Sequence, residues 1–438
     1  MLEKIKRILK NYNEEPEGLE TCECGLASAN AHHNVITGMI GNLRMWLSHQ
    51  DYFLVIVNGK ILNPGFEARQ ENLLIYKDKI IGTSSNLPEN LPENVCNINI
   101  IDADNLVITP GLVDQHIHGG YGCDFNYSSV EEIIEFSQKL PRHGITSILP
   151  TVMTASENVL KKQISNINTA KKFQPLNSTK LLGIHLEGPY LSPKYKGIHP
   201  KSEILVPSVE NFKRIEDPEI KIVTYAPELD ENFEFTKYLA SKNIIPAAGH
   251  TDADSSEIRA AAGAGLRQIT HMFNAMRPLN HRNPGVAGEA LINDNLYVEV
   301  IADTLHLHPA IIDIILRTKP DSKIIFISDS LPLNQADADS IIFGGQKIFK
   351  ENNKAVNSEG TLAGSLMFLD SALKNQANLA VSSFSDLLKF ASLNVCTNLG
   401  RHDLGFIDAG KYADLVLWNM TNYRINMTII NGQIAFKA

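Results

Sequence analysis

Two histidines, His116 and His118, are separated by one residue and follow an apolar run from Leu106 to Val113. Side chains two positions apart on a strand point to the same side, so the two imidazoles are expected to converge. A buried polar pair is costly unless something binds it, and a divalent metal is the simplest partner, because neutral imidazole is the commonest metal ligand. A pair of hydrogen-bonded core or surface histidines is the alternative that this motif leaves open.

Other histidines and acidic residues also stand directly after short apolar segments. A single one of them would mean little. A whole series in one chain is hard to explain by packing alone. These residues are His185 and Glu187, His250, His271, Asp303 and His306, and Asp329.

The elements that must position these residues alternate between short apolar segments and helical ones from about residue 109 to 404. This alternation predicts a parallel sheet or barrel, and roughly eight apolar segments are the number in an α/β TIM (β/α)8 barrel. The carboxyl ends of barrel strands form one mouth, so distant residues would meet there. The expected strands are 112–113, 146–149, 180–184, 220–223, 244–245, 267–270, 296–301 and 323–327, and 130–140 and 255–264 are expected helices.

Both ends of the chain are rich in expected strands. Residues 51–108 and 405–438 are predicted to form one small β-sandwich domain, and 109–404 the catalytic barrel. Residues 1–50 look like an extension of unknown role. A zinc site could be drawn there from Cys22, Cys24, His32 and His33, but their spacing fits no common zinc motif.

Composition narrows the classes of function. The 438 residues carry a net charge of -9, which disfavours a nucleic-acid binder, although a local Arg could still bind a small anionic substrate. No apolar run approaches the roughly 20 residues of a membrane span. The five cysteines are an odd number in a long chain and predict reduced thiols in a cytoplasmic protein.

The residue types also suggest the metal chemistry. Four histidines with one carboxylate, Glu187, suit Zn, Fe or Mn better than Mg or Ca. A bound metal lowers the pKa of its water towards about 7 and polarises a carbonyl, and hydrolysis then needs a carboxylate to move the proton. Asp329 is the candidate. Its alternatives are a helix-capping Asp before Ser330 or a further metal ligand.

At this point the chain resembles the amidohydrolase superfamily, and within it the N-acetylglucosamine-6-phosphate deacetylase family. The resemblance covers about residues 53 to 436. It rests on several motifs that are specific in combination. They are His-Ile-His-Gly-Gly at 116–120, His-Leu-Glu-Gly-Pro at 185–189, Thr-His-Met-Phe-Asn-Ala-Met at 270–276, Ser328-Asp329 and Leu-Ala-Gly-Ser at 362–365.

The resemblance implies a role for each matching position. Glu187, His250 and His271 would hold the catalytic metal, and His116 and His118 would complete a second position, so one or two divalent ions per subunit are expected. Asp329 would be the general base and then the acid. Substrate contacts are implied for Ile198, His199 (acetyl carbonyl), Asn274 and Ala275 (backbone amides to the phosphate), Arg282 (phosphate, from a neighbouring subunit), Asp303, His306, Leu362, Ala363 and Gly364.

The implied reaction is hydrolysis of the acetyl group from N-acetylglucosamine 6-phosphate, in a homodimer or higher homo-oligomer. Two kinds of rival remain: a different amidohydrolase, such as one acting on N-acetylgalactosamine 6-phosphate or a cyclic amide, and a non-catalytic scaffold. The chain also departs from the family pattern. Thr304 replaces a usual Gly, which puts substrate fit in question, Ser330 replaces a usual Ala, and Asn394-Val395-Cys396 lacks the usual Pro-Ala.

Overall fold

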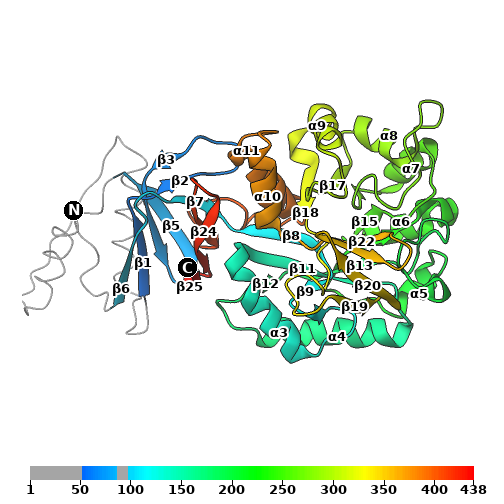
Figure 1. Ribbon diagram of the computed structural model, residues 1–438, viewed down its shortest axis with the longest axis horizontal. Helices are drawn as coiled ribbons and strands as arrows, with labels where there is room; N and C mark the ends of the chain where they lie inside the picture. Colours follow the sequence, from blue (N-terminus) through cyan, green and yellow to red (C-terminus); the bar gives the residue numbers. More distant parts are fainter. Residues whose placement is uncertain (1–51, 86–96) are drawn as a thin grey trace, which may run out of the picture.

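A parallel β-barrel forms the centre of the protein in a computed structural model that describes residues 52–85 and 97–438 (Figure 1). Its sheet runs in the order β11-β13-β14-β15-β16-β17-β18, β8 pairs with β11, and the short β12 (Lys180–Leu181) also lies beside β11. The predicted TIM barrel is therefore confirmed. The barrel strands are β8 (Leu112–Ile117), β11 (Ile145–Met153), β13 (Ile184–Glu187), β14 (Ile220–Tyr225), β15 (Ile245–Ala248), β16 (Gln268–Ile269), β17 (Tyr297–Ile301) and β18 (Ile324–Ile327).

The barrel closes between its first and last strands through residues just beyond the regular ladders. The backbone amide of Asp329 donates to the carbonyl of His116 at 2.9 Å. The amide of His118 donates to the carbonyl of Ser330 at 2.9 Å, and Ile117 bridges Ser330 in parallel register. The histidine pair and Asp329 are therefore side by side because they close the barrel.

Helices follow the strands in sequence, and capping residues set where several of them begin. Ser129 and Glu132 form a reciprocal capping box at the start of α3, and Asp254 and Glu257 form another at the start of α7. The predicted helix 255–264 has the observed bounds. The helices are α3 (Val130–Lys139), α4 (Glu157–Phe173), α5 (Val209–Lys213), α6 (Glu234–Ser241), α7 (Ser255–Ala264), α8 (Gly285–Ile292), α9 (Pro309–Thr318), α10 (Leu369–Asn378), α11 (Phe384–Leu388) and α12 (Asn394–Asn398).

Two further sheets combine both ends of the described chain, at the left of Figure 1. One has the order β5-β4-β1-β6 and the other β25-β24-β23-β7-β2-β3. An apolar cluster joins them, with Ile56, Leu73 and Leu415 among its buried members. The proposed boundary between residues 108 and 109 falls inside strand β7 (Val107–Pro110). The division into a sandwich and a barrel domain at this point remains a prediction. The strands are β1 (Tyr52–Val57), β2 (Lys60–Ile61), β3 (Arg69–Gln70), β4 (Asn72–Tyr76), β5 (Lys79–Ser84), β6 (Asn97–Asp102), β7 (Val107–Pro110), β23 (Leu415–Asn419), β24 (Arg424–Ile430) and β25 (Gln433–Lys437).

A four-stranded antiparallel sheet between β18 and α10 was not predicted. It consists of β19 (Ser340–Phe343), β20 (Gln346–Glu351), β21 (Lys354–Asn357) and β22 (Leu362–Gly364). Phe343, Ile348 and Ala355 are buried in a separate small apolar cluster. Leu362, Ala363 and Gly364, expected to contact the substrate, form strand β22 of this sheet.

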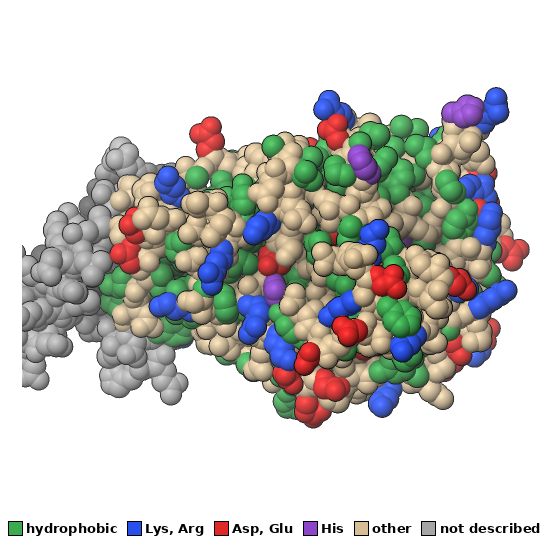
Figure 2. Space-filling view, viewed as in Figure 1, with side chains coloured by type: hydrophobic (Ala, Val, Ile, Leu, Met, Phe, Trp, Pro, Cys, Tyr) green, Lys and Arg blue, Asp and Glu red, His purple; other side chains and the backbone are tan. Residues whose placement is uncertain are grey.

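The surface in Figure 2 carries basic and acidic side chains that are interspersed across the face in view. No helix within 52–85 and 97–438 is both long and apolar enough to cross a membrane. The proposed extension 1–50, with Cys22, Cys24, His32 and His33, lies outside the described residues.

The ion pair between Lys180 and Asp414 links the barrel to the six-stranded sheet, and Lys180→Met tests its contribution. The two Nζ–Oδ distances are 2.9 and 2.6 Å, and the Asp414 side chain is only 4% exposed. The substitution removes the cation paired with this buried carboxylate, which keeps a hydrogen bond from the Asn431 amide at 2.9 Å. We therefore expect the free energy of unfolding to fall by about 3–5 kcal/mol, measured by urea unfolding followed by circular dichroism.

Lys161→Met is the matched control. Lys161 pairs with Glu157 at 2.5 Å, but the two side chains are 49% and 45% exposed, so the urea midpoint should hardly move. Equal midpoints for the two variants would contradict a stabilising role for the Lys180–Asp414 pair.

Candidate active site

Five imidazoles surround the buried carboxylate of Glu187, which lies at the end of β13. His271 Nε2 and His250 Nε2 lie 3.0 and 3.2 Å from Glu187 Oε1, and His116 Nε2 lies 3.5 Å from the same atom. His118 Nε2 and His199 Nε2 lie 3.3 and 3.4 Å from Oε2. The sequence motifs at four barrel strands and one loop thus meet around one carboxylate.

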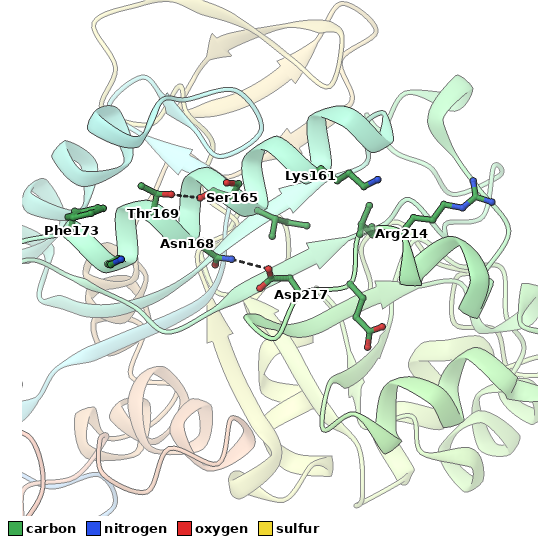
Figure 3. Close-up of a pocket in the computed structure, with 11 residues that line it drawn as sticks. Lys161, Ser165, Asn168, Thr169, Phe173, Arg214 and Asp217 are labelled. Atoms are coloured by element: carbon green, nitrogen blue, oxygen red, sulfur yellow. Dashed lines mark hydrogen bonds between the residues drawn. The ribbon is translucent and has the colours of Figure 1, made fainter.

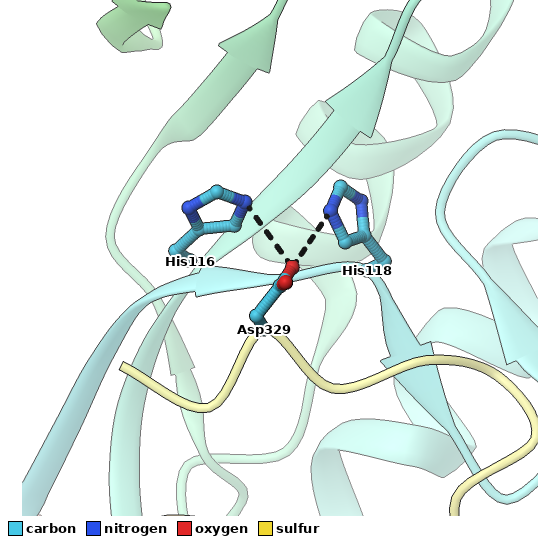
Figure 4. A group of neighbouring side chains, drawn as sticks. All are labelled: His116, His118 and Asp329. Carbon is cyan, nitrogen blue, oxygen red and sulfur yellow. Dashed lines mark ion pairs between the residues drawn. The ribbon is translucent and has the colours of Figure 1, made fainter. Parts of the chain in front are cut away.

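Asp329 lies on the side of this cluster formed by the histidine pair (Figure 4). Its Oδ1 is 3.5 Å from His116 Nε2 and 3.3 Å from His118 Nε2. Asp329 therefore faces the same space as Glu187. The sequence left two alternative roles for Asp329. Helix capping does not fit, because no helix begins between β18 and β19. A role as a further metal ligand fits the geometry.

Hydrogen bonds on the far side of two rings direct the Nε2 lone pairs into the cluster. His250 Nδ1 donates to the carbonyl of Tyr195 at 2.9 Å, and His116 Nδ1 donates to Glu299 Oε2 at 3.0 Å. In a neutral imidazole the other nitrogen is then an acceptor. His116 Nε2 is buried and has no hydrogen-bond partner.

This donor set fits a divalent metal. Imidazole nitrogens and carboxylate oxygens that converge on one space are the ligands of Zn, Fe or Mn. Donor atoms of His116, His118 and Asp329 lie within 4.8 Å of one another, as do those of Glu187, His199 and His250. The geometry therefore has room for one ion or for two.

Three residues of the cluster have a left-handed backbone. The φ angles are 48° at His250, 29° at His271 and 49° at Asp329. Such values are uncommon for residues other than Gly and persist where the surrounding structure enforces them. They turn the chain sharply at the strand ends and direct these side chains toward Glu187.

Burial and the neighbouring charges set the protonation states in the absence of a metal. Burial opposes ionisation of Glu187, but the charge and hydrogen bond of His116 outweigh it and hold the pKa of Glu187 well below its usual range. Burial also opposes the charged form of His118, but Asp329 and Glu187 raise its pKa to about 9. Burial dominates at His199 and lowers its pKa to about 4.

A cavity of about 560 Å³ opens above the cluster. That volume suits a small-molecule substrate. Lys194, Tyr195, Met153 and Phe343 also line it, although the sequence analysis had not singled them out. The predicted residues that line it are His118, Glu187, Ile198, His199, His250, His271, Asn274, Ala275, His306, Asp329, Leu362, Ala363 and Gly364.

Three predicted site residues do not line the cavity. His116 lies behind the cluster and is fully buried. Asp303 accepts from the Nδ1 of His306 at 2.7 Å and so orients that ring. Arg282 is exposed in the loop before α8.

The backbone amides of Asn274 and Ala275, which were expected to bind the phosphate, differ in their hydrogen bonding. The Asn274 amide already donates to the carbonyl of His271 at 2.9 Å. The Ala275 amide makes no backbone hydrogen bond within the described chain and is the freer donor.

Two of the departures from the family pattern, Thr304 and Ser330, differ in how well the structure accommodates them. Thr304 adopts φ of 68°, a conformation that a β-branched residue takes only under strain. Ser330 Oγ donates to the carbonyl of Gly119 and accepts from Asn334 Nδ2, both at 2.9 Å, so its hydroxyl is satisfied inside the protein.

His185 donates to the carbonyl of Gln115 and accepts from Thr224, so it supports the site without facing the cavity.

Glu299 is the buried residue of this region that the sequence analysis missed. It stands in β17 between Val298 and Val300 and is fully buried. A carboxylate inside an apolar strand is costly unless it is paired, and that signal could have identified it.

A second cavity, of about 480 Å³, lies outside the barrel between α4 and the segment before β14 (Figure 3). Asn168 donates to Asp217 across it at 3.1 Å. Two of the three cations that line it are already paired, because Lys161 and Arg214 both contact Glu157. No candidate metal-ligand group among the described residues lies there.

Comparisons with known proteins agree with this geometry. A Bacillus subtilis (strain 168) protein named N-acetylglucosamine-6-phosphate deacetylase is 39% identical over 336 residues, which cover 75% of this chain and 85% of that protein. The crystal structure of N-acetylglucosamine-6-phosphate deacetylase from Thermotoga maritima superposes with a TM-score of 0.78 at 30% identity and covers 88% of this chain and 100% of that one.

The N-acetylgalactosamine-6-phosphate deacetylase of Escherichia coli O157:H7 is 27% identical over 343 residues, covering 77% of this chain and 90% of that protein. Residues 107–435 match the Amidohydrolase family. The matched region contains the barrel, the histidine pair, Glu187 and Asp329, and the chain belongs to the amidohydrolase family.

Proposed function

We propose that the protein hydrolyses the N-acetyl group of N-acetylglucosamine 6-phosphate to glucosamine 6-phosphate and acetate. The observation that carries this proposal is the convergence of His116, His118, His250 and His271 on Glu187, with Asp329 at the same cavity. The similar Bacillus subtilis and Thermotoga maritima proteins, which bear the name of this activity, support the choice of substrate.

Glu187, His250 and His271 would hold one divalent metal, and His116 and His118 would hold a second with Asp329 or Glu187. A bound Zn, Fe or Mn supplies Lewis acidity, which activates water and polarises the acetyl carbonyl. The protein contributes the placement of the donors, since each ring is oriented by its own strand end.

Asp329 is proposed to move the proton. Burial raises its pKa, but the hydrogen bond with His118 and the nearby imidazoles outweigh burial and hold the pKa below its usual value, so the group is a carboxylate at neutral pH. It accepts a proton from the attacking water and gives it to the departing amine. One carboxylate acting first as base and then as acid closes the proton cycle.

His199 is proposed to bind the acetyl carbonyl. The Thr154 hydroxyl lies 2.8 Å from His199 Nδ1 and can donate to it. Its Nε2–H then faces the cavity as a donor. Its low pKa, caused by burial, keeps the ring neutral.

The phosphate is proposed to contact the Ala275 amide and Arg282 of a second copy of the chain. Lys194 is the only Lys or Arg among the described residues that line the cavity, and its Nζ pairs with Asp252 at 2.9 Å. A phosphate dianion in this cavity therefore has no free cation among the lining residues at 52–85 and 97–438 of the same chain. Arg is well suited to supply one, because its planar fork matches phosphate oxygens.

We propose the cytoplasm as the site of action. Cys123 and Cys396 are buried free thiols, which agrees with a reducing compartment.

Metal removal is the first test. Purified protein should contain one or two equivalents of Zn, Fe or Mn by elemental analysis, and treatment with a chelator should abolish acetate release and lower the thermal midpoint, because a bound ion stabilises the folded state. Adding back metal should restore both. Full activity in the metal-free protein would contradict the proposal.

Asp329→Asn tests the proton carrier. We expect kcat for N-acetylglucosamine 6-phosphate to fall by about 10²–10⁴, the usual contribution of general acid–base catalysis. Metal content and KM should stay near the unsubstituted values if Asp329 mainly moves the proton. Assaying the galactosamine epimer and unphosphorylated N-acetylglucosamine alongside identifies the preferred substrate.

Arg282→Ala and Asp329→Asn together test whether the site is shared between copies. Each variant alone should be nearly inactive. Co-refolding the two should restore activity, because a mixed dimer has one site with Asp329 from one chain and Arg282 from the other. Without any recovery, Arg282 would have to act within its own chain or not at all.

A further inference from the structure

Glu299 is a buried carboxylate inside the barrel that the proposed reaction does not use. Its side chain is 0% exposed and stands in the middle of β17. Keeping an ionised group there requires compensating hydrogen bonds. Its contacts therefore indicate why the fold tolerates it.

The Glu299 carboxylate accepts from four donors. Gln115 Nε2 and Gln268 Nε2 donate to Oε1 at 2.8 and 2.9 Å. His116 Nδ1 and the His271 amide donate to Oε2 at 3.0 and 3.3 Å. No Lys or Arg is among these partners, and His116 is the one ionisable side chain among them, although a ring nitrogen of His185 also lies within 4.8 Å of this carboxylate.

The contact with Glu299 determines which nitrogen of His116 faces the metal-ligand cluster. A carboxylate at Nδ1 keeps the hydrogen there and leaves the lone pair on Nε2. That Nε2 atom is buried and unpartnered, 3.5 Å from both Glu187 Oε1 and Asp329 Oδ1. The ring is thereby ready to bind a cation.

Neighbouring rings are held differently. The Nδ1 of His250 donates to a backbone carbonyl, that of Tyr195. Both nitrogens of His185 are occupied, although its ring centroid lies only 4.5 Å from that of His116. Among these three rings, only that of His116 is oriented by a charged side chain.

We propose that Glu299 is a positioning residue that presents His116 to a metal and thereby determines occupancy of the metal position that includes His116 and His118. The proposal rests on the proposed metal centre. It adds that the second position depends on a carboxylate that touches neither metal nor substrate.

Glu299→Gln is the informative substitution, because it keeps the length of the side chain. A carboxamide has one acceptor oxygen and one NH₂ group. Either the two glutamine side chains at the first oxygen or His116 and the His271 amide at the second would then face an NH₂ group instead of an acceptor. The His116 ring then either loses its charged acceptor or adopts the opposite tautomer.

The experiment titrates metal-free protein with Co²⁺, followed by calorimetry and visible absorption, and uses His116→Asn to identify the position that includes His116. In Glu299→Gln we expect the affinity of that position to fall about 10–100-fold, with the other position retained. In the His116→Asn background, Glu299→Gln should cause no further loss. An unchanged affinity, or equal loss with and without His116, would overturn the proposal.

Glu289→Gln is the matched control. Glu289 on α8 is also buried, but its carboxylate pairs with Arg259 of α7 at 2.6 Å. It is not one of the described residues that contact the metal cluster. Its Co²⁺ affinities should equal those of the unsubstituted protein. If Glu289→Gln lowered the Co²⁺ affinity as much as Glu299→Gln does, the proposal would be overturned.

A measurement on the unsubstituted protein covers the case in which Glu299→Gln does not fold. Histidine-selective ¹⁵N NMR of the Zn²⁺-loaded protein, assigned with His116→Asn, should show His116 bearing its hydrogen on Nδ1 and binding the metal through Nε2. A neutral ring protonated on Nε2 would overturn the proposal. Both readouts are independent of acetate release, so an error in the proposed substrate would leave their meaning intact.

Discussion

The site depends on how the barrel closes. The segment after the last strand hydrogen-bonds to the end of the first strand, from the Asp329 amide to the His116 carbonyl and from the His118 amide to the Ser330 carbonyl. These backbone bonds determine the separation between the proposed proton carrier and the histidine pair. A barrel that failed to close would therefore lose the site before any side chain changed. Because structure and chemistry share the same residues, substitutions at this seam affect both.

The second constraint is electrostatic. A fully buried carboxylate surrounded by neutral rings is unstable unless positive charge is nearby. Glu187 has five imidazoles around it, and Glu299 supports one of these rings from behind. In the absence of metal, protons on the histidines supply the positive charge, as the raised pKa of His118 indicates. A divalent ion supplies it without needing those protons, so the arrangement favours binding an ion.

The sequence predicted the parts of the fold that repeat. Apolar segments ending in His or acidic residues identified the barrel strands, and the helix expected at 255–264 has the bounds of α7. The sheet at 340–364 was missed because its strands are short and half exposed and interrupt the alternation of strand and helix. Glu299 was missed because a Val-Glu-Val run reads as ordinary strand alternation, although both faces of this strand are buried. The proposed contribution of Arg282 involves a second copy of the chain, which a single chain does not contain.

The six-stranded sheet has a consequence for biosynthesis. Strand β7, immediately before the first barrel strand, pairs with β23 from residues 415–419. During translation, the edge of β7 therefore lacks its partner strand until nearly the whole barrel has left the ribosome. Contacts that are so distant in sequence form slowly. The six-stranded sheet can therefore be completed only after the barrel sequence has been synthesised, and truncation before residue 415 would leave the edge of β7 without its partner strand and open to pairing with other chains.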